Sequence, residues 1–217
     1  MQKTGRIIIR GIVQGVGFRP FVYAQAKKFD ISGRVKNLGS EVEILAAGPR
    51  FDEFLRAVRI GPPMARIDSV DVYPLEEEIG RGFVIVPSGK GALSGMIPPD
   101  IATCDQCLDD IDRDGSRYSG YWCTSCVNCG PRYSIIQSLP YDRECTSMND
   151  FPVCTGCGNE YLDPGSRRHH AQPSACQTCG LRLSLLHNSG SHVESWDVMV
   201  ETAGLFDGGA IVAIRGI

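Results

Sequence analysis

The chain has 217 residues, of which 42% are hydrophobic and 22% charged, and its formal net charge is −3. This composition is typical of a globular protein, and no apolar stretch approaches the ~20 residues that cross a bilayer. The amino terminus, where Arg10 and Gly11 interrupt a short apolar run, lacks the pattern of a secretory signal. Ten cysteines in an unexported chain point to a reducing compartment, so we expect a cytoplasmic protein with no membrane partner.

The first ninety residues alternate between strand and helix patterns. Apolar or alternating runs predict strands at 6–13, 32–37, 42–46, 67–73 and 83–86. Helical spacing predicts helices from Pro20 to about Phe29 and over 51–58, because proline suits the first turn of a helix. This order is that of the ferredoxin-like βαββαβ sandwich, so the predicted fold class is α+β.

A glycine-rich loop over residues 11–19 joins the first strand to the first helix. Gly15 and Gly17 let the backbone curl so that several N–H groups point inward, toward the positive end of the helix dipole. Arg19 can add a bidentate contact to an anion. The loop therefore predicts a phosphate site, and the alternative is an ordinary glycine-rich turn with a surface arginine.

The same segment, Gly11-Ile-Val-Gln-Gly-Val-Gly-Phe-Arg19, resembles the signature loop of the acylphosphatase family. A second family signature is recognisable in Gly33-Arg-Val-Lys-Asn37, followed by Val42 and Gly48. Arg34 stands where an aromatic is usual and Glu41 where a glycine is usual, so the turn over 38–41 departs from the family pattern. The resemblance covers about residues 4–91.

This resemblance implies a catalytic pair, in which Arg19 holds the phosphate and Asn37 orients the attacking water. It also implies a phosphate-binding loop made of Gln14, Gly15, Val16, Gly17, Phe18 and Arg19. The implied reaction is in-line attack of water on an acyl phosphate, whose good leaving group lets positioning and charge stabilisation suffice. The alternative is a related domain that binds anions without turning them over.

Residues 87–99 have the Gly, Pro and Ser content of a linker. Beyond it, eight of the ten cysteines repeat the pattern Cys-x2-Cys, eighteen residues, Cys-x2-Cys, with the second copy 50 residues after the first. Each Cys-x2-Cys turn aims two sulfurs at a point about 2.3 Å away, and two turns close a tetrahedral shell around Zn²⁺. Two structural zinc sites are predicted, with rubredoxin-like iron or disulfides as alternatives. Their ligands are Cys104, Cys107, Cys126 and Cys129, then Cys154, Cys157, Cys176 and Cys179.

Both repeats also contain Gly-Ser-Arg, at 115–117 and 165–167, which indicates a duplicated unit. Cys123 and Cys145 are both interpreted as spectators. Cys123 lies three residues before Cys126, so the alternative is a second register in which it is a ligand of the first site. His170 is interpreted as a packing residue, and the alternative places the segment His170-Ala-Gln-Pro173 in the lining of a site.

Charge argues against a nucleic-acid partner for the cysteine repeats. Residues 100–180 carry six Arg, no Lys and 11 Asp and Glu, whereas residues 1–91 carry 14 Lys and Arg against 10 Asp and Glu. Affinity for nucleic acid depends on cations that neutralise phosphates, so the charge disfavours a nucleic-acid-binding zinc protein, the third alternative, and we expect no nucleic-acid partner.

After Leu181 the sequence predicts one amphipathic segment, 196–206, and one apolar run, 210–214. A single helix and strand cannot bury a core of their own. We interpret residues 182–217 as the truncated beginning of a third domain.

The whole chain is identified as a member of the HypF family, the carbamoyltransferases that mature nickel–iron hydrogenases. The resemblance rests on domain order and on shared stretches: Ala102-Thr-Cys-x2-Cys-Leu108, Cys126-x2-Cys-Gly-Pro-Arg132, Pro140-Tyr-Asp-Arg143, Glu160-Tyr161, Arg167-Arg168, His170-Ala-Gln-Pro173 and Ala210-Ile-Val-Ala-Ile214. It implies an acylphosphatase-like domain at 1–91, a tandem zinc-finger region at 92–181 with units at 100–131 and 150–181, and the start of a YrdC-like nucleotide-binding domain at 182–217.

In that family the acylphosphatase-like site hydrolyses carbamoyl phosphate to carbamate and phosphate. The resemblance further implies that the full-length parent uses ATP and Mg²⁺ to make carbamoyl adenylate and passes the carbamoyl group to the C-terminal cysteine of a partner protein. We expect only the first step from this chain. The alternative is a zinc-dependent protein-interaction module whose first domain binds anions without catalysis.

Overall fold

The computed structural model describes residues 3–75, 77–89, 97–195 and 197–215. The chain divides into two compact units, Met1–Gly180 and Leu181–Ile217. Trp196 and residues 90–96 of the predicted linker lie outside the described residues.

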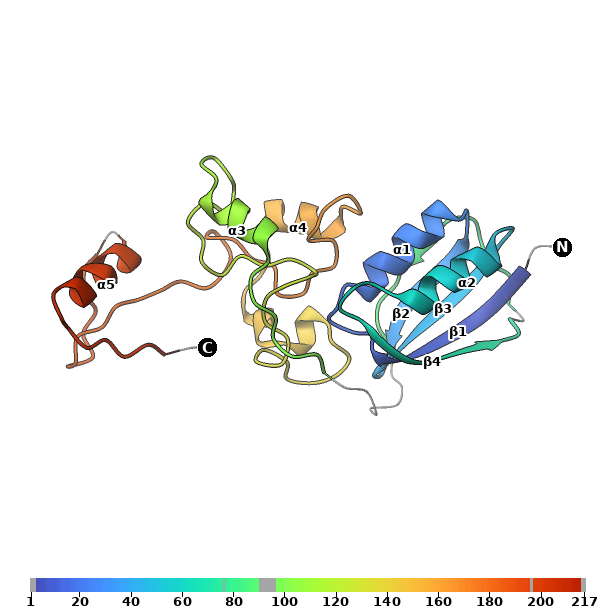
Figure 1. Cartoon of the computed structure of the whole chain (residues 1–217), viewed down its shortest axis with the longest axis horizontal. Helices are drawn as coiled ribbons and strands as arrows, with labels where there is room; N and C mark the ends of the chain where they lie inside the picture. The colour runs from blue at the N-terminus through green and yellow to red at the C-terminus, as the bar shows by residue number, and fades with distance from the viewer. Residues whose placement is uncertain (1–2, 76, 90–96, 196, 216–217) are drawn as a thin grey trace. The chain divides into compact units, whose positions relative to one another are not determined.

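The first unit contains a five-stranded sheet that two helices cover on one face (Figure 1). Its strands are β1 (Lys3–Ile12), β2 (Ser32–Leu38), β3 (Glu41–Gly48), β4 (Arg66–Tyr73) and β5 (Phe83–Ile85), and its helices are α1 (Phe18–Lys28) and α2 (Phe51–Ile60). The strand order is β4-β1-β3-β2-β5, antiparallel except for the parallel pair β2–β5. The predicted α+β class is confirmed, and each predicted element in this region lies within three residues of its expected bounds.

Alternation along the strands places the core between sheet and helices. Ile7 and Ile9 of β1 are fully buried together with Phe54 of α2. Burying each such side chain contributes about 1.5–3 kcal/mol. Asn37 lies two residues after the buried Val35 on β2, so its polar side chain shares the apolar face of the sheet and is 1% exposed.

The cysteine repeats form a region of short helices and turns. Here α3 (Asp105–Asp112) begins one residue after Cys104, and α4 (Thr155–Leu162) begins one residue after Cys154. Two 3-10 turns, η1 (Arg143–Cys145) and η2 (Ser147–Asp150), lie between the repeats. The equivalent helix starts confirm that the sequence repeat is a structural repeat. Residues 97–180 are called the finger region below.

The end of the predicted strand 83–86 and Gly89 of the predicted linker both bond to β2. The Val86 amide donates to the Val35 carbonyl at 3.0 Å, and the Gly89 amide donates to the Asn37 carbonyl at 2.8 Å. Composition alone misassigned Gly89, because the unpaired edge of β2 supplies hydrogen-bond partners that a local pattern does not show.

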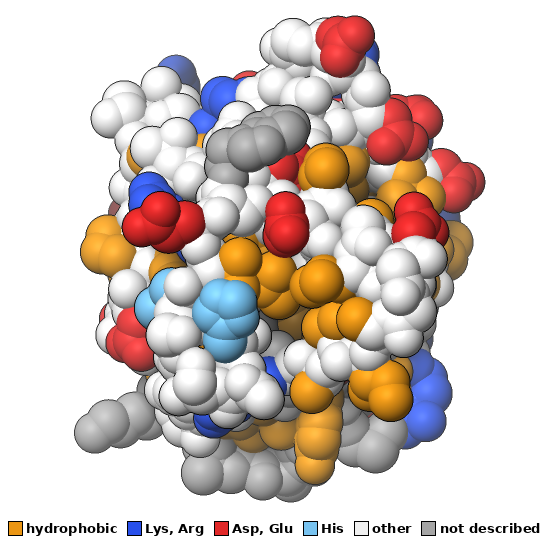
Figure 2. Space-filling model, turned by 90° about the vertical axis from the view of Figure 1, so that its left-hand side faces the viewer, with side chains coloured by type: hydrophobic (Ala, Val, Ile, Leu, Met, Phe, Trp, Pro, Cys, Tyr) orange, Lys and Arg blue, Asp and Glu red, His pale blue; other side chains and the backbone are white. Residues whose placement is uncertain are grey.

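The second unit contains α5 (Val198–Asp207), whose first turn is capped by the Asp197 carboxylate through the amide of Met199 at 2.9 Å. The apolar run 210–214 forms no strand, because no described strand lies beside it to complete its hydrogen bonds. Figure 2 shows one face of the molecule, with hydrophobic side chains gathered near the centre of the view. Exposed ones in this unit include Leu183, Leu186, Met199, Val200, Phe206, Ile211 and Ile214. Within the described residues, no helix is long and apolar enough to cross a membrane.

Candidate active site and metal clusters

The glycine-rich loop curls over the start of α1. Gly15 and Gly17 adopt φ angles of 67° and 72°, a left-handed conformation that other residues rarely take. Gly17 is the N-cap of α1, so the unpaired amides of the first helical turn open toward the loop. The backbone therefore has the form of an anion cradle.

A small cavity lies between this loop and the end of β2. The predicted residues Gln14, Gly15, Gly17, Phe18, Arg19 and Asn37 all line it. Val16 does not, because its side chain packs in the hydrophobic core. The structure thus brings together the two predicted catalytic side chains and most of the predicted phosphate loop.

Asn37 presents polar atoms that the described residues leave unpaired. Neither its Nδ2 nor its Oδ1 has a hydrogen-bond partner among them, although both atoms are buried. An unsatisfied buried polar group costs about 1–3 kcal/mol. Asn37 and Arg19 line the same cavity. The unpaired amide of Asn37 is therefore suited to binding a polar molecule in that cavity.

The finger region covers the cavity, and its side chains hold the loop. Arg132, which is 1% exposed, donates from Nε to the Gly15 carbonyl oxygen. The Tyr141 amide donates to Gln14 Oε1 at 3.0 Å, and Gln14 Nε2 donates in turn to the Gly39 carbonyl at 2.9 Å. A Cβ on Gly15 would lie 3.1 Å from the Arg132 side chain, so the close approach of the two regions requires glycine there.

Arg19 forms an ion pair with a residue of the finger region. Its Nη2 lies 2.6 Å from Asp142 Oδ1, and both side chains are largely buried. Its Nη1 lies 3.4 Å from Ser88 Oγ, and Ser88 also donates to Asp142 Oδ2. The predicted phosphate ligand therefore already holds a carboxylate.

His170 also lines the cavity, in a left-handed backbone conformation with φ 53°. Its ring packs against those of Tyr161 and His169, with centroids 4.9 and 4.7 Å away. Burial, with smaller contributions from the charges of Arg19 and His169, lowers the pKa of His170 to about 4. The imidazole is therefore neutral at pH 7. The ring both packs against its neighbours and lines the cavity, so each of the two interpretations describes part of its setting.

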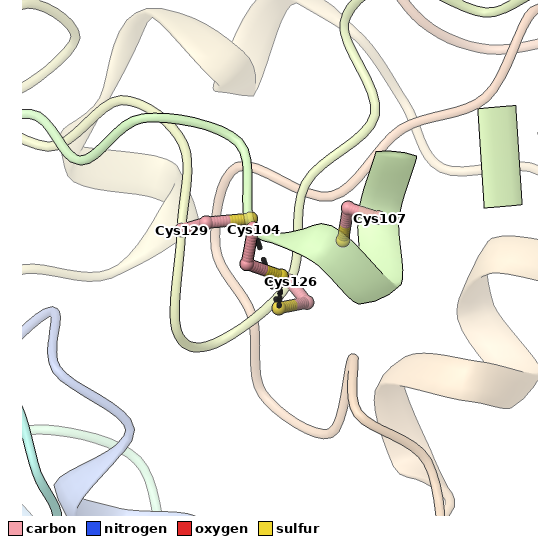
Figure 3. Close-up of side chains that lie close together, drawn as sticks. All are labelled: Cys104, Cys107, Cys126 and Cys129. Carbon is pink, nitrogen blue, oxygen red and sulfur yellow. Dashed lines mark hydrogen bonds between the residues drawn. The ribbon is translucent and has the colours of Figure 1, made fainter. Parts of the chain in front are cut away.

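The eight predicted cysteines form two clusters, each with its four sulfurs within 4.8 Å of one another. In the first, Cys126 Sγ lies 3.8 Å from Cys104 Sγ and 3.7 Å from Cys129 Sγ (Figure 3). In the second, Cys176 Sγ lies 3.7 Å from Cys154 Sγ. A tetrahedron of sulfurs about 2.3 Å from a central ion has edges of about 3.8 Å, so both clusters fit a four-thiolate metal site.

The surroundings move the pKa values of the cysteines in both directions. Hydrogen bonds with Cys126 and Cys129 raise the pKa of Cys107, and burial raises the pKa of Cys157 to about 12. A hydrogen bond from the Cys157 amide lowers the pKa of Cys154 to about 6, and hydrogen bonds from neighbouring thiols lower the pKa of Cys129. Metal binding requires thiolates, so the lowered pKa values of Cys154 and Cys129 assist it, whereas those of Cys107 and Cys157 do not. Cys123 and Cys145 lie outside both clusters, and the second register does not occur.

Arginines from each repeat lie against the cysteines of the other. Arg117 Nη2 lies 3.4 Å from Cys157 Sγ, and Arg167 Nη1 lies 3.4 Å from Cys107 Sγ. Four thiolates around one divalent ion carry a net charge of −2. Each guanidinium lies close enough to offset part of that charge.

The sequence interpretation missed Val127, Arg132 and Tyr141 of the cavity, and it placed the segment 170–173 in the lining of a site only as an alternative. Two motifs that the sequence analysis singled out contain residues that lie at or beside the cavity. Pro140-Tyr-Asp-Arg143 supplies Tyr141 and Asp142, and the segment 170–173 supplies His170 and Gln172. The Arg143 amide donates to Gln172 Oε1 at 2.8 Å, so the two motifs meet at the cavity.

Comparison with known proteins agrees with this arrangement. A sequence model described as acylphosphatase matches residues 5–85, and one described as HypF finger matches residues 103–136 and 153–186. An acylphosphatase of Caldivirga maquilingensis is 47% identical over 33% of this chain and 79% of its own length. The carbamoyltransferase HypF of Rhodobacter capsulatus is 44% identical over 99% of this chain and 29% of its own length.

A solved structure gives the same result. The crystal structure of full-length HypF in the phosphate- and nucleotide-bound form superposes with a TM-score of 0.90 at 38% identity, covering 100% of this chain and 29% of that one. The chain spans under a third of the length of these carbamoyltransferases. With an acylphosphatase domain followed by two HypF fingers, it belongs to the HypF family.

Proposed function

We propose that this chain hydrolyses an acyl phosphate, and that its substrate is carbamoyl phosphate. The observation that carries the proposal is the meeting of Arg19, the unpaired Asn37 and the helix-capping loop around one cavity. The relatives are named carbamoyltransferases, and the similar crystal structure is described as phosphate-bound, which supports a phosphate compound as ligand.

The geometry suits direct attack of water on phosphorus. The loop amides and Arg19 bind the phosphoryl oxygens and offset the charge that develops on them. Asn37 Oδ1 accepts a hydrogen bond from water and holds it in line with the bond that breaks. The water oxygen bonds to phosphorus, the bridging oxygen leaves with the carbamoyl group as carbamate, and the protons of the water remain with the products.

Phosphate release from carbamoyl phosphate tests this assignment. We expect Arg19→Ala and Asn37→Ala each to lower kcat/KM by about 100-fold or more, since each removes a positioning or charge-stabilising contact. Arg59→Ala, on the exposed side of α2, is the matched control and should retain the wild-type rate. Equal rates in all four proteins would overturn the proposal.

We further propose that both cysteine clusters hold structural Zn²⁺. Four thiolates fill the coordination shell, so the ion supplies folding free energy and no site for substrate. Metal analysis should find two zinc ions per chain. Iron with the visible absorption of a thiolate complex, or disulfides in the protein purified under reducing conditions, would contradict this assignment.

For the full-length family setting we propose the remaining steps that the resemblance implies. These are ATP- and Mg²⁺-dependent formation of carbamoyl adenylate and transfer to the C-terminal cysteine of a partner protein during maturation of nickel–iron hydrogenase. We also propose the division into 1–91, 92–181 and 182–217, with the last segment belonging to a YrdC-like domain, and a cytoplasmic setting that keeps the thiols reduced. The same carbamoyl phosphate assay on the full-length protein, with ATP and the partner, tests the later steps.

A second candidate is a zinc-dependent interaction module whose first domain only binds anions. The pairing of Arg19 with Asp142 favours it, since this carboxylate takes the contact that a substrate needs. It predicts no turnover of any acyl phosphate and partner binding that chelators abolish.

A further inference from the structure

The carboxylate of Asp142 is bound to Arg19 as an anionic ligand would be. One oxygen, Oδ1, lies 2.6 Å from Arg19 Nη2, and the other accepts from Ser88 Oγ. The exposed fractions of the Arg19 and Asp142 side chains are 10% and 16%. A pair so shielded from water interacts more strongly than a surface ion pair.

The scaffold on either side of Asp142 fixes its backbone. On one side the Tyr141 amide bonds to Gln14. On the other side Arg143 donates through its amide to Gln172 Oε1 and through Nη1 to the carbonyls of Gln172 at 2.7 Å and Ser174 at 2.9 Å. The carboxylate is thus delivered to Arg19 by a preorganised turn, and it can leave only by rotating its own side chain.

Arg19 borders two spaces of very different size. The cavity that Arg19 shares with Asn37 has a volume of about 20 Å³, which accommodates about one water molecule. Arg19 and Asp142 also border a groove of about 450 Å³ on the other side, lined in part by Ser88 and Glu144. Arg19 thus faces both the cavity and the groove, and a phosphate that reaches it must compete with the Asp142 carboxylate.

We propose that Asp142 is a built-in counter-ion that positions Arg19 and competes with phosphate for it. The inference rests on the proposed function, because it assigns the phosphate group to Arg19. When phosphate binds, it takes the Nη2 contact and the carboxylate rotates toward the groove. When the product leaves, the carboxylate returns, which lowers the affinity for inorganic phosphate and speeds its release. The finger region thereby sets the affinity of a site on the first domain.

The consequence for binding follows from competition. A ligand that must first displace an internal partner binds only those molecules in which the partner has let go. Its apparent Kd is the intrinsic Kd divided by the fraction of such molecules. Asp142→Asn keeps the shape of the side chain and removes its charge, so it weakens the competitor. We expect inorganic phosphate to bind Asp142→Asn on the order of tenfold more tightly. KM for carbamoyl phosphate should fall in parallel, whereas kcat should not rise.

The test is calorimetric titration of inorganic phosphate into the full chain, with steady-state kinetics on the same proteins. Glu144→Gln is the matched control, because it removes the same charge from an exposed residue of the same groove. It should shift the phosphate Kd by less than about twofold. Ser88→Ala, which releases one oxygen of Asp142, should tighten phosphate in the same direction but less.

The outcomes separate this inference from the proposed function. If wild type and Arg19→Ala bind phosphate equally, the assignment of phosphate to Arg19 fails. If binding depends on Arg19 but neither Asp142→Asn nor Ser88→Ala tightens it, only the counter-ion role fails. If Glu144→Gln tightened phosphate binding as much as Asp142→Asn, the effect would come from the negative charge of the groove in general. That result would also overturn the inference.

Discussion

Arg117 of the first cysteine repeat lies against the sulfurs of the second, and Arg167, its equivalent 50 residues later, lies against the sulfurs of the first. Both belong to the repeated Gly-Ser-Arg motif. Each arginine also binds a carboxylate, Glu160 for Arg117 and Asp110 for Arg167. The duplicated units are therefore joined by reciprocal contacts, and the charge of each metal site is offset by the other repeat.

Removing one of these arginines should weaken metal binding in the opposite repeat. A hydrogen bond to a charged group contributes about 1.5–3 kcal/mol, so Arg117→Ala should speed zinc release from the second cluster by about tenfold, and Arg167→Ala from the first. Release is measured with a colorimetric chelator, and Cys104→Ser or Cys154→Ser backgrounds separate the clusters. Arg113→Ala is the control, because Arg113 contacts Asp110 from an exposed position. Faster release from the repeat that carries the mutation would contradict the crossed arrangement.

Arg132 joins the finger region to the phosphate loop, and its loss should destabilise both. Its guanidinium donates to the carbonyl oxygens of Gly15, Cys126, Val127, Cys129 and Pro131. Arg132→Ala leaves these buried acceptors unpaired and should cost at least ~3 kcal/mol, which lowers Tm by about 6–12 °C. Arg132→Lys should lose most of the same stability, because an ammonium cannot form the planar fork. A melting curve within ~2 °C of wild type for both variants would refute this role.

Substitution of Asn37 by alanine should abolish hydrolysis without lowering the stability of the fold. Its two buried polar atoms lack partners among the described residues, so Asn37→Ala removes an unsatisfied group. We expect a free energy of unfolding between the wild-type value and about 1 kcal/mol above it, measured by urea denaturation, while phosphate release is lost. Asn149→Ala, in an exposed position, controls for a general asparagine effect. A loss of stability above ~2 kcal/mol would show that Asn37 is a structural residue.

His170 should make the fold sensitive to mild acid. Burial, aided by Arg19 and His169, holds its pKa at about 4, below the ordinary value of 6.5. The unfolded chain therefore binds more protons between pH 4 and 6.5, so the contribution is fully present above pH 6.5 and is lost as the pH falls toward 4. His170→Asn, which tolerates the left-handed backbone, should reduce this loss of stability. The measurement is urea denaturation across that range in both proteins, and identical pH slopes would contradict the shifted pKa.

The sheet and helices of residues 3–85 could be predicted because each buries one face against the other. The alternation of Ile7 and Ile9 and the spacing of Phe51, Phe54 and Val58 carry that information locally. Spacing likewise predicted the eight clustered cysteines, since Cys-x2-Cys is itself a local geometry.

Contacts between distant segments could not be predicted in this way. The pairing of Arg19 with Asp142 joins residues 123 positions apart in different regions, and nothing in either local pattern specifies it. The apolar run 210–214 shows the opposite error, because a strand sequence forms no strand without a neighbour to bond with. A local sequence pattern indicates which element a segment can form, and the segments that pack or bond beside it determine whether that element forms.

The central claim is that water attacks phosphorus at a site formed by Arg19 and Asn37. Hydrolysis of carbamoyl phosphate in ¹⁸O-labelled water, with the uncatalysed reaction subtracted, tests it most directly. The account predicts one ¹⁸O atom in each phosphate released by the wild-type chain and by Arg59→Ala, and no catalysed release by Arg19→Ala or Asn37→Ala. Unlabelled phosphate, or labelled phosphate formed equally fast by the Arg19 and Asn37 variants, would contradict it.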